Sequence, residues 1–365
     1  AVLLVVSAEE SVMPQTREHF DICRLLGLRD GLVVLTKSDL VDRDTVELVS
    51  LEVRELVAGT FLAHAPIVAA SAVTGAGLDE VRAELVALAR RLPSRRASGV
   101  VRLPIDRVFS VKGFGTVVTG TLVGGRVAVD DELVLLPSGR PVKVRGLQGH
   151  GAALPAAEAA QRLAVNLSGI DVDEVARGET LASTAAFEPT RVLDATVDVL
   201  ESARALKHGA RVRFHFGTSE LLGRVALSGL TRGSAVADPV AGAPAVEIPP
   251  GGAAHVRVRL EAPAVVTRGD RFILRAYSPP VTIAGGTVLD PHPPRGGSGR
   301  GAVASLPVPQ REPHLLERPA PGPACGLHAL ARPVDPVVGE EPPPVGAGLE
   351  GLEDVARRNP ELAAK

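Results

Sequence analysis

The sequence has 365 residues, which is enough for two or three domains. Apolar residues make up 45% of it, so a sizeable core can form. The formal net charge of −2 excludes attraction to nucleic acid through the overall charge of the protein. Aromatic residues make up only 2%, which disfavours stacking platforms for single-stranded nucleic acid.

The sequence shows no membrane or export segment. No apolar run reaches the roughly 18 residues of a membrane span. The apolar opening, residues 1–6, lacks an initiator Met and the basic region of a signal peptide, so we expect that the natural protein extends further or was cut there. Cys23, Cys325 and His292 have no partners at metal-ligand spacing, and the cysteines form no disulfide framework. We assign no metal site and expect a reducing cytoplasm.

Residues 1–93 alternate strands and helices. We expect strands at 1–6, 32–35 and 67–70, and helices at 14–26, 41–58 and 78–92. Pro14 lies in the first turn of the first helix, and Gly27 caps its end. This order predicts a parallel sheet with helices on its faces.

Residues 100–184 and 190–290 change to short strands with glycine-marked turns. In the first segment we expect strands at 100–105, 108–111, 115–122, 132–135, 141–148 and 161–167. In the second we expect them at 191–199, 211–217, 222–230, 254–260, 271–276 and 281–289. Each segment therefore predicts a small β-barrel.

The tail, residues 291–365, holds 15 of the 30 prolines and no hydrophobic period apart from a possible short helix at 349–358. Such a composition cannot bury enough apolar surface to offset the entropy of ordering, so we expect disorder or weak order.

Two strand ends carry motifs that suit a guanine base. Residues 32–39 read LVVLTKSD, in which Thr36 begins the polar part and Asp39 ends it. A carboxylate can accept the N1–H and an N2–H of guanine together, whereas adenine offers no such pair. Residues 67–75 read IVAASAVTG and place a second polar turn after the next strand.

The remaining side chains of these motifs fit the same base. Lys37 would lay its aliphatic stem along the purine plane. Ser71 and the backbone N–H of Ala72 would hold the loop and meet the guanine O6. Both motifs follow strands whose carboxyl ends share one edge of the sheet, where ligands bind. An ordinary cap and an ordinary turn are the alternative, which the correct order of the two motifs disfavours.

The phosphate half of such a site is missing. The sequence contains no G-x-x-x-x-G-K-[ST] loop, and no D-x-x-G follows a strand. Hydrolysis of GTP needs that loop, a Mg²⁺ site and a positioned water. We therefore expect weak GTP binding and no hydrolysis, and we assign no catalytic residue. We also expect that the domain lacks its first strands, so that its sheet is incompletely covered.

Several stretches resemble translational GTPases, most specifically the bacterial selenocysteine-specific elongation factors. They are residues 12–19 (VMPQTREH), 21–27 (DICRLLG), 104–121 (PIDRVFSVKGFGTVVTGT), 215–218 (HFGT) and 285–292 (GGTVLDPH). The resemblance covers residues 1 to about 295. It implies part of a P-loop GTPase α/β domain (1–93), two barrels (100–184 and 190–290) and a Pro/Gly-rich tail.

The resemblance also implies a function. Such factors bind GTP with Mg²⁺ and deliver selenocysteinyl-tRNA to the ribosome at recoded UGA codons, although the Mg²⁺ ligands are absent from this sequence. They bind an mRNA hairpin through C-terminal winged-helix domains, and the tail shows no such pattern. That hairpin is a partner only if a winged-helix region exists, and no membrane partner is expected.

The resemblance places an aminoacyl pocket on the first barrel at Asp106, Arg107 and Arg162. A selenol is largely ionised at neutral pH and a serine hydroxyl is not, so the guanidinium groups would favour selenocysteine over serine. Asp106 could meet the α-amino group. The alternative is a set of surface ion pairs on a barrel rim.

Other readings stay open. Residues 113–120 resemble a phosphate loop but precede a strand, so a turn inside the barrel is expected. His215 with Arg211, Arg213 and Arg224 could face the tRNA stem or form a solvated strand face. The chain could be a fragment, a frame-shifted gene product or a degraded paralogue. It could also be a non-hydrolysing tRNA- or protein-binding module, or a general aminoacyl-tRNA or initiator-tRNA carrier.

Overall fold

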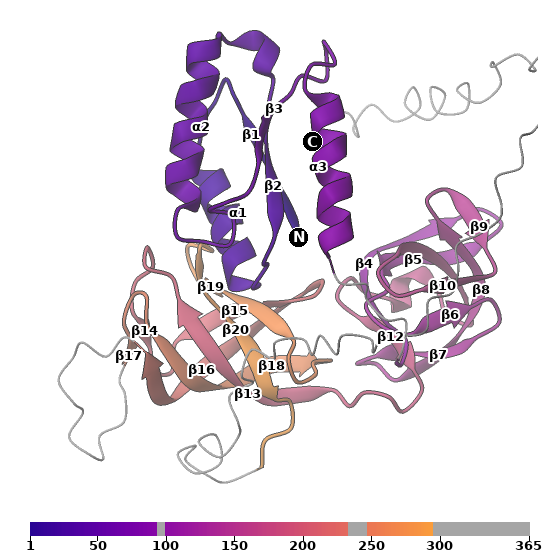
Figure 1. Cartoon of the computed structure of the whole chain (residues 1–365). Coiled ribbons are helices and arrows are strands. Elements are labelled where there is room, and N and C mark those ends of the chain that lie inside the picture. The colour runs from indigo at the N-terminus through magenta and orange to yellow at the C-terminus, as the bar shows by residue number, and fades with distance from the viewer. Residues whose placement is uncertain (93–98, 233–246, 295–365) are drawn as a thin grey trace, which may run out of the picture. The chain divides into compact units, whose positions relative to one another are not determined.

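The computed structural model describes residues 1–92, 99–232 and 247–294, with the side chains at 229–232 excepted. It contains an α/β part followed by two β-barrels (Figure 1). This architecture confirms the expected fold class. From residue 295 onward, the expected tail and its short helix lie outside the described residues.

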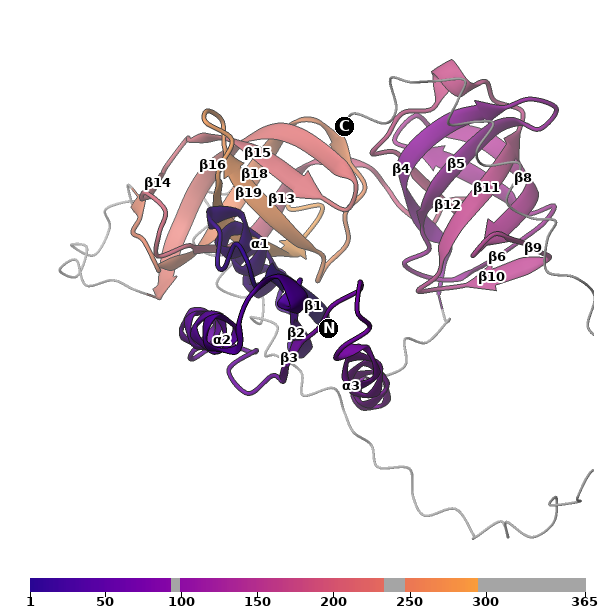
Figure 2. The ribbon, with the colours of Figure 1, turned by 90° about the horizontal axis from the view of Figure 1, so that it is seen from above.

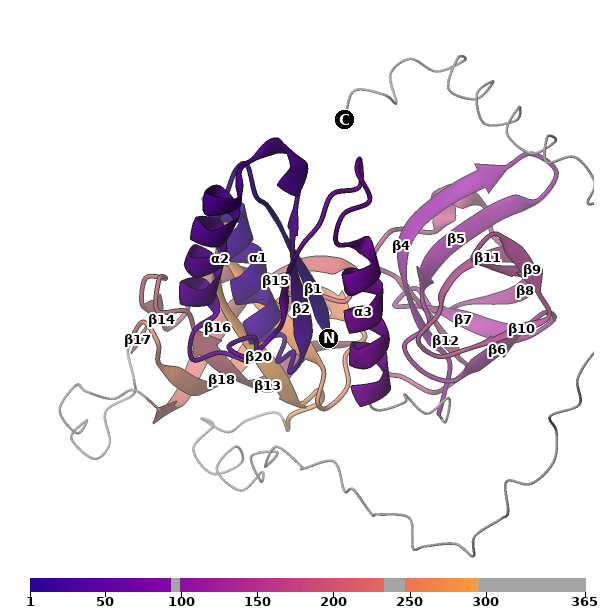
Figure 3. The ribbon, with the colours of Figure 1, turned by 45° about the horizontal axis from the view of Figure 1, so that its top comes forward.

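The α/β part is built on a three-stranded parallel sheet. The strands β1 (Val2–Ser7), β2 (Gly31–Thr36) and β3 (Ile67–Ala69) lie in the order β1-β2-β3. The helices α1 (Pro14–Leu25) and α2 (Arg43–Val57) cover one face of the sheet, and α3 (Leu78–Arg91) covers the other (Figure 3).

The apolar faces of the helices explain this packing. Val49, Val53 and Val57 recur every four residues along α2, so they share one side of the helix and pack with Phe20 of α1. The N-cap Asp42 accepts a hydrogen bond from the Thr45 amide at 2.8 Å and starts α2.

The sheet is only partly covered. β1 is an edge strand, and the side chains of Leu3 and Val5 on its open face are 42% and 53% exposed. The central strand β2, in contrast, is buried almost throughout. This agrees with the expectation of an incompletely covered sheet.

The first barrel is a closed ring of six strands, and Figure 2 shows part of this ring. The strands lie in the order β11-β5-β4-β12-β7-β8, and pairing of β11 with β8 closes the ring. Their bounds are Arg162–Ser168, Gly115–Thr121, Arg102–Val111, Thr180–Ser183, Glu132–Leu136 and Arg140–Gly149. The short strands β6 (Arg126–Ala128), β9 (Ala152–Leu154) and β10 (Ala156–Glu158) pair at its margin.

The second barrel is closed by six strands in the order β13-β18-β16-β15-β19-β20. Their bounds are Thr190–Val199, Ala253–Ala264, Ser219–Arg232, Arg211–Phe216, Arg271–Ala276 and Thr282–Asp290. The short strands β14 (Leu206–Lys207) and β17 (Glu247–Ile248) form a separate pair. Phe214 and Phe272 meet inside the barrel with ring centroids 4.6 Å apart.

Some expected strands differ from the structure: β12 was not expected, β16 is longer than expected, and two expected strands of the first barrel are one. Instead of separate strands at 100–105 and 108–111, the structure has the single strand β4. The strand remains continuous because its register against β5 shifts between Ile105 and Arg107, which leaves Asp106 as an extra residue in a β-bulge. The expectation of a glycine turn is confirmed for residues 112–114, where Gly113 has a positive φ, whereas Gly115, also with a positive φ, already begins β5.

Across the described ranges, no helix is long and apolar enough to cross a membrane.

Candidate functional site

The two motifs expected to read guanine lie at one edge of the sheet. β2 and β3 are parallel neighbours, with Leu35 opposite Ala69, so their carboxyl ends adjoin. The Ser38 amide donates a hydrogen bond to the Ala70 carbonyl at 3.3 Å and ties the two ends together. Asp39 lies in the one-turn 3-10 helix Ser38–Leu40. The structure therefore brings together the motifs that the sequence separates by about thirty residues.

Ser71 has a structural part in this edge. It is fully buried, and its hydroxyl accepts hydrogen bonds from the amides of Val73 at 3.2 Å and Thr74 at 3.1 Å. The hydroxyl thereby shapes the loop after β3. Within the described part of the chain, neither the Ala72 N–H nor the exposed Asp39 carboxylate has a hydrogen-bond partner. A donor and an acceptor thus remain available at this edge for a base.

Thr36 and Lys37, the other two residues of the motif after β2, already make contacts within the protein. The Thr36 hydroxyl donates to the Val6 carbonyl at 3.3 Å, so it joins β2 to β1. Lys37 has a left-handed backbone with φ of 57°, and its Nζ lies 3.6 Å from Glu9 and 3.9 Å from Glu10. Exposed ion pairs of this kind contribute about 0–1 kcal/mol, so the lysine stem can still move over a ligand.

The residues present fit the base of a guanine nucleotide. Asp39 offers an acceptor and Ala72 a donor, the two kinds of group with which guanine pairs, and Ser71 holds the loop that contains Ala72. The sequence supplies no phosphate loop beside them. The fit is therefore limited to the base, and no step of phosphate chemistry can be assigned to these residues.

The second candidate site lies on the first barrel, where three strands place one side chain each. Asp106 comes from the bulge of β4, Thr119 from β5 and Arg162 from β11. The Thr119 hydroxyl donates to the Asp106 carboxylate at 2.6 Å. Arg162 binds both carboxylate oxygens, with its Nη2 3.0 Å from Oδ1 and its Nη1 on Oδ2. These contacts form a compact cluster of one cation, one anion and one hydroxyl.

The charge state of Asp106 is set by this cluster. Burial, the largest single effect, raises the pKa of its carboxyl. The hydrogen bonds from Arg162 and Thr119 and the positive charges of Arg162 and Arg107 together outweigh burial, so the pKa lies below its usual value. Asp106 is therefore an anion at neutral pH. Arg107 is exposed and acts on Asp106 through its charge.

Arg162 is held on one side and open on the other. Its side chain is 53% exposed, whereas the Asp106 side chain is 22% exposed. Within the described residues, its Nε has no hydrogen-bond partner. The guanidinium can thus accept a further anionic ligand while the carboxylate fixes its orientation.

Thr119 belongs to this cluster although no sequence motif marks it. The only signal for it is its place in the strand next to both charged residues, and this becomes visible only with the strand register.

The basic group on the second barrel is largely paired. Arg211 makes two hydrogen bonds to Glu261, at 2.8 and 2.9 Å, and Arg213 pairs with Glu220. Burial, the largest cause, lowers the pKa of His215. These contacts leave less free positive charge on this face than the sequence suggests.

The fold and site define a class. An α/β part followed by two barrels is the arrangement of translation elongation factors. Three family models match in the same order: the elongation factor Tu GTP binding domain at residues 1–92, elongation factor Tu domain 2 at 115–182, and the selenocysteine-specific elongation factor β-barrel domain at 193–295.

Individual relatives narrow this class. The chain is 45% identical over 291 residues to the selenocysteine-specific elongation factor of Desulfomicrobium baculatum, covering 80% of this chain and 44% of the relative. It is 34% identical over 297 residues to that of Escherichia coli (strain K12), covering 81% and 44%. The chain belongs to the selenocysteine-specific elongation factor family. It spans under half the length of these curated relatives.

Solved structures agree. A bacterial selenocysteine-specific elongation factor, EF-Sec, matches with a TM-score of 0.69 and 29% identity over 82% of this chain and 46% of that one. The apo form of translation elongation factor SelB from Methanococcus maripaludis matches with a TM-score of 0.70 and 25% identity, over 80% and 65%.

Proposed function

We propose that this chain carries the base-reading edge and the aminoacyl pocket of a selenocysteine-specific elongation factor. In this proposal, Asp39 and Ala72 bind guanine, and the Asp106–Thr119–Arg162 cluster receives the aminoacyl group of selenocysteinyl-tRNA for delivery to the ribosome at recoded UGA codons. The observation that carries the proposal is the Arg162 guanidinium, which Asp106 orients and which stays open to a ligand.

The pocket chemistry accounts for the choice of amino acid. Arg162 is a cation in both cases, so it also donates a charge-assisted hydrogen bond to a serine hydroxyl, and only the ionised selenol adds an opposite charge. An ion pair at a half-exposed side chain contributes about 0.2–1 kcal/mol, which corresponds to at most about fivefold in affinity. Arg107 adds positive charge nearby, and the Asp106 anion suits the α-amino group.

In this proposal, the residues of this chain bind only the base of GTP, and not its phosphates or Mg²⁺. A bound GTP with Mg²⁺ would supply the phosphate chemistry, whereas this chain's residues bind and orient the base. Asp39 would accept from the guanine ring, and the loop held by Ser71 would present the Ala72 N–H.

Protection of the aminoacyl ester from hydrolysis tests the pocket. The full chain is mixed with selenocysteinyl-tRNA or seryl-tRNA, and deacylation rates give the two dissociation constants. We expect the wild type to favour selenocysteinyl-tRNA by up to about fivefold, and Arg162→Ala to abolish this preference because the ionised selenol loses its cation. Arg145→Ala, which removes an exposed arginine of the same barrel, is the matched control. A preference that survives Arg162→Ala would rule out the pocket, and a wild type without preference would indicate a general aminoacyl-tRNA carrier.

A second candidate is a tRNA-binding module that does not hydrolyse GTP. The absence of a phosphate loop from the sequence favours it. We expect the chain to show no GTP hydrolysis above buffer while it still protects selenocysteinyl-tRNA. Hydrolysis that co-purifies with the chain through two columns and is lost in Asp39→Asn would contradict this candidate.

A further inference from the structure

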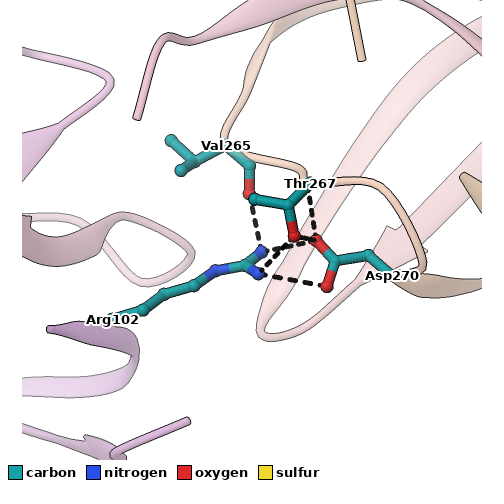
Figure 4. A network of polar contacts seen from close by, with 4 residues as sticks. All are labelled: Arg102, Val265, Thr267 and Asp270. Carbon is teal, nitrogen blue, oxygen red and sulfur yellow. Dashed lines mark hydrogen bonds and ion pairs between the residues drawn. The ribbon is translucent and has the colours of Figure 1, made fainter. Parts of the chain in front are cut away.

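Arg102, the first residue of β4, crosses from the first barrel into the second. Its Nη1 donates to Asp270 at 3.0 Å and to the Thr267 hydroxyl at 3.2 Å, and its Nη2 donates to Asp270 at 2.8 Å and to the Val265 carbonyl at 2.9 Å (Figure 4). All four acceptors belong to the segment between β18 and β19. The Arg102 side chain is only 9% exposed, so these contacts are shielded from water.

The acceptors are held in place by their own turn. The Asp270 carboxylate accepts the Thr267 amide at 2.6 Å and the Thr267 hydroxyl at 3.0 Å. The Asp270 amide in turn donates to the Thr267 carbonyl at 3.1 Å. Because the turn holds its own acceptors in place, Arg102 binds them with two nitrogens at once, as a planar guanidinium can.

Aromatic rings complete the enclosure of Arg102. Its guanidinium carbon lies 5.2 Å from the ring centroid of Phe216 in the second barrel and 5.6 Å from that of Phe187 in the segment between the barrels. Cation–π contacts are strengthened when the cation is desolvated. The planar cation is thus held both at its edge and by its faces.

A second contact between the barrels lies near the aminoacyl pocket. The Ser219 hydroxyl, at the start of β16, donates to the Gly178 carbonyl of the first barrel. Gly217 lies against Pro104, since a Cβ on this glycine would be 3.6 Å from the proline Cβ. Pro104 lies two residues along β4 from both Arg102 and Asp106. The strand that carries the pocket carboxylate is therefore fastened to the second barrel at two points.

We propose that Arg102 is a positioning residue, which fixes β4 and its Asp106 bulge against the second barrel so that a ligand reaching both barrels meets one preformed surface. This inference rests on the proposed aminoacyl-tRNA binding. A preformed surface lowers the entropy cost of binding a large ligand. Arg102 touches no pocket residue, so its loss should weaken all aminoacyl-tRNAs equally, whereas loss of Arg162 should change the ratio between them.

The distance between the barrels tests the physical part of the inference. Spin labels are placed at Ser138→Cys and Ser202→Cys, both exposed, in the full chain with Cys23→Ser and Cys325→Ser. We expect a narrow distance distribution for Arg102 and a clearly broader one for Arg102→Ala. Asp270→Asn should also broaden it, because it removes the charge but keeps an acceptor for the Thr267 amide. Arg102→Lys, with one donor group in place of two, should fall between, and Arg145→Ala should match the wild type.

Binding tests the functional part with the same variants. We expect Arg102→Ala to weaken selenocysteinyl-tRNA and seryl-tRNA by the same factor, about tenfold, with Arg102→Lys recovering part of the loss. Circular dichroism and the Arg102→Lys variant show whether each barrel is still folded. A distance distribution that stays narrow in Arg102→Ala overturns the inference. A broad distribution also overturns it if tRNA binding is unchanged, or if the ratio between the two tRNA affinities changes. If the wild type binds no aminoacyl-tRNA, the proposed function fails, and the distance measurement still decides whether Arg102 holds the barrels.

Discussion

At the scale of residues, the carboxylates of Asp39 and Asp106 lie in contrasting settings, the first just after the end of β2 and the second in the bulge within β4. Asp39 is exposed and, within the described chain, has no hydrogen-bond partner, whereas Asp106 is partly buried and binds Thr119 and Arg162. Asp39 can therefore give both oxygens to a ligand. Both carboxylate oxygens of Asp106 already accept hydrogen bonds from Thr119 and Arg162, so the main role of Asp106 is to orient Arg162.

Replacing Asp39 with Asn tests base reading. We expect GDP affinity to fall about 10–100-fold, because a charged acceptor of two N–H groups becomes a neutral amide. Xanthosine diphosphate should bind better than GDP to the variant, since the amide can donate to the xanthine oxygen. Calorimetric titration with both nucleotides measures this. Asp44→Asn, an exposed change in α2, is the control, and unchanged GDP affinity in Asp39→Asn would exclude the role of Asp39.

The residues of both sites could be predicted from the sequence, and the resemblance grouped Asp106 with Arg162, but the contacts within the sites could not be predicted. The T-K-x-D and S-A-x-T-G motifs are local, so Asp39 and Ser71 were identified directly. The binding of Arg162 to Asp106, 56 residues away, depends on three neighbouring strands and on a one-residue bulge.

At the scale of elements, the loop between β3 and α3 depends on two glycines in the left-handed region. Gly75 has φ of 80° and Gly77 has φ of 71°. A Cβ on Gly75 would meet open space, whereas a Cβ on Gly77 would lie 2.0 Å from the Ala69 carbonyl oxygen. Only at Gly77 does the absence of a side chain allow the loop to approach the end of β3.

These glycines form a matched pair for mutation. We expect Gly75→Ala to lower the free energy of unfolding by about 1–2 kcal/mol through backbone strain alone. Gly77→Ala should cost about 1–3 kcal/mol more, because the backbone must also move away from Ala69. Urea unfolding measures both. Equal losses would mean that the close approach at Gly77 does not matter.

At the scale of the whole molecule, two partly buried histidines of the second barrel link stability to pH. Burial is the largest cause of the lowered pKa of His215 and of His255, so the fold favours their neutral forms. Below about pH 6.5, these two histidines bind protons in the unfolded chain more readily than in the folded protein. Their contribution to stability is therefore present above pH 6.5 and is lost as the pH falls below it.

We expect the double variant His215→Gln, His255→Gln to have a smaller loss of unfolding free energy between pH 7 and pH 5 than the wild type. The difference in slope should approach about one proton per histidine. Urea unfolding at several pH values measures it, with His292→Gln as the exposed control. Identical slopes in the wild type and the double variant would contradict this link.

The sequence by itself determined the order of α/β part and barrels, because helical and strand periods and glycine turns are local properties of the chain. It also determined which residues could read a guanine base. Tertiary structure alone decided that β4 is one bulged strand, that Thr119 joins the pocket, and that Arg102 reaches Asp270, 168 residues away. These pairings depend on strand register and on packing between barrels, and neither leaves a periodic signal in the sequence.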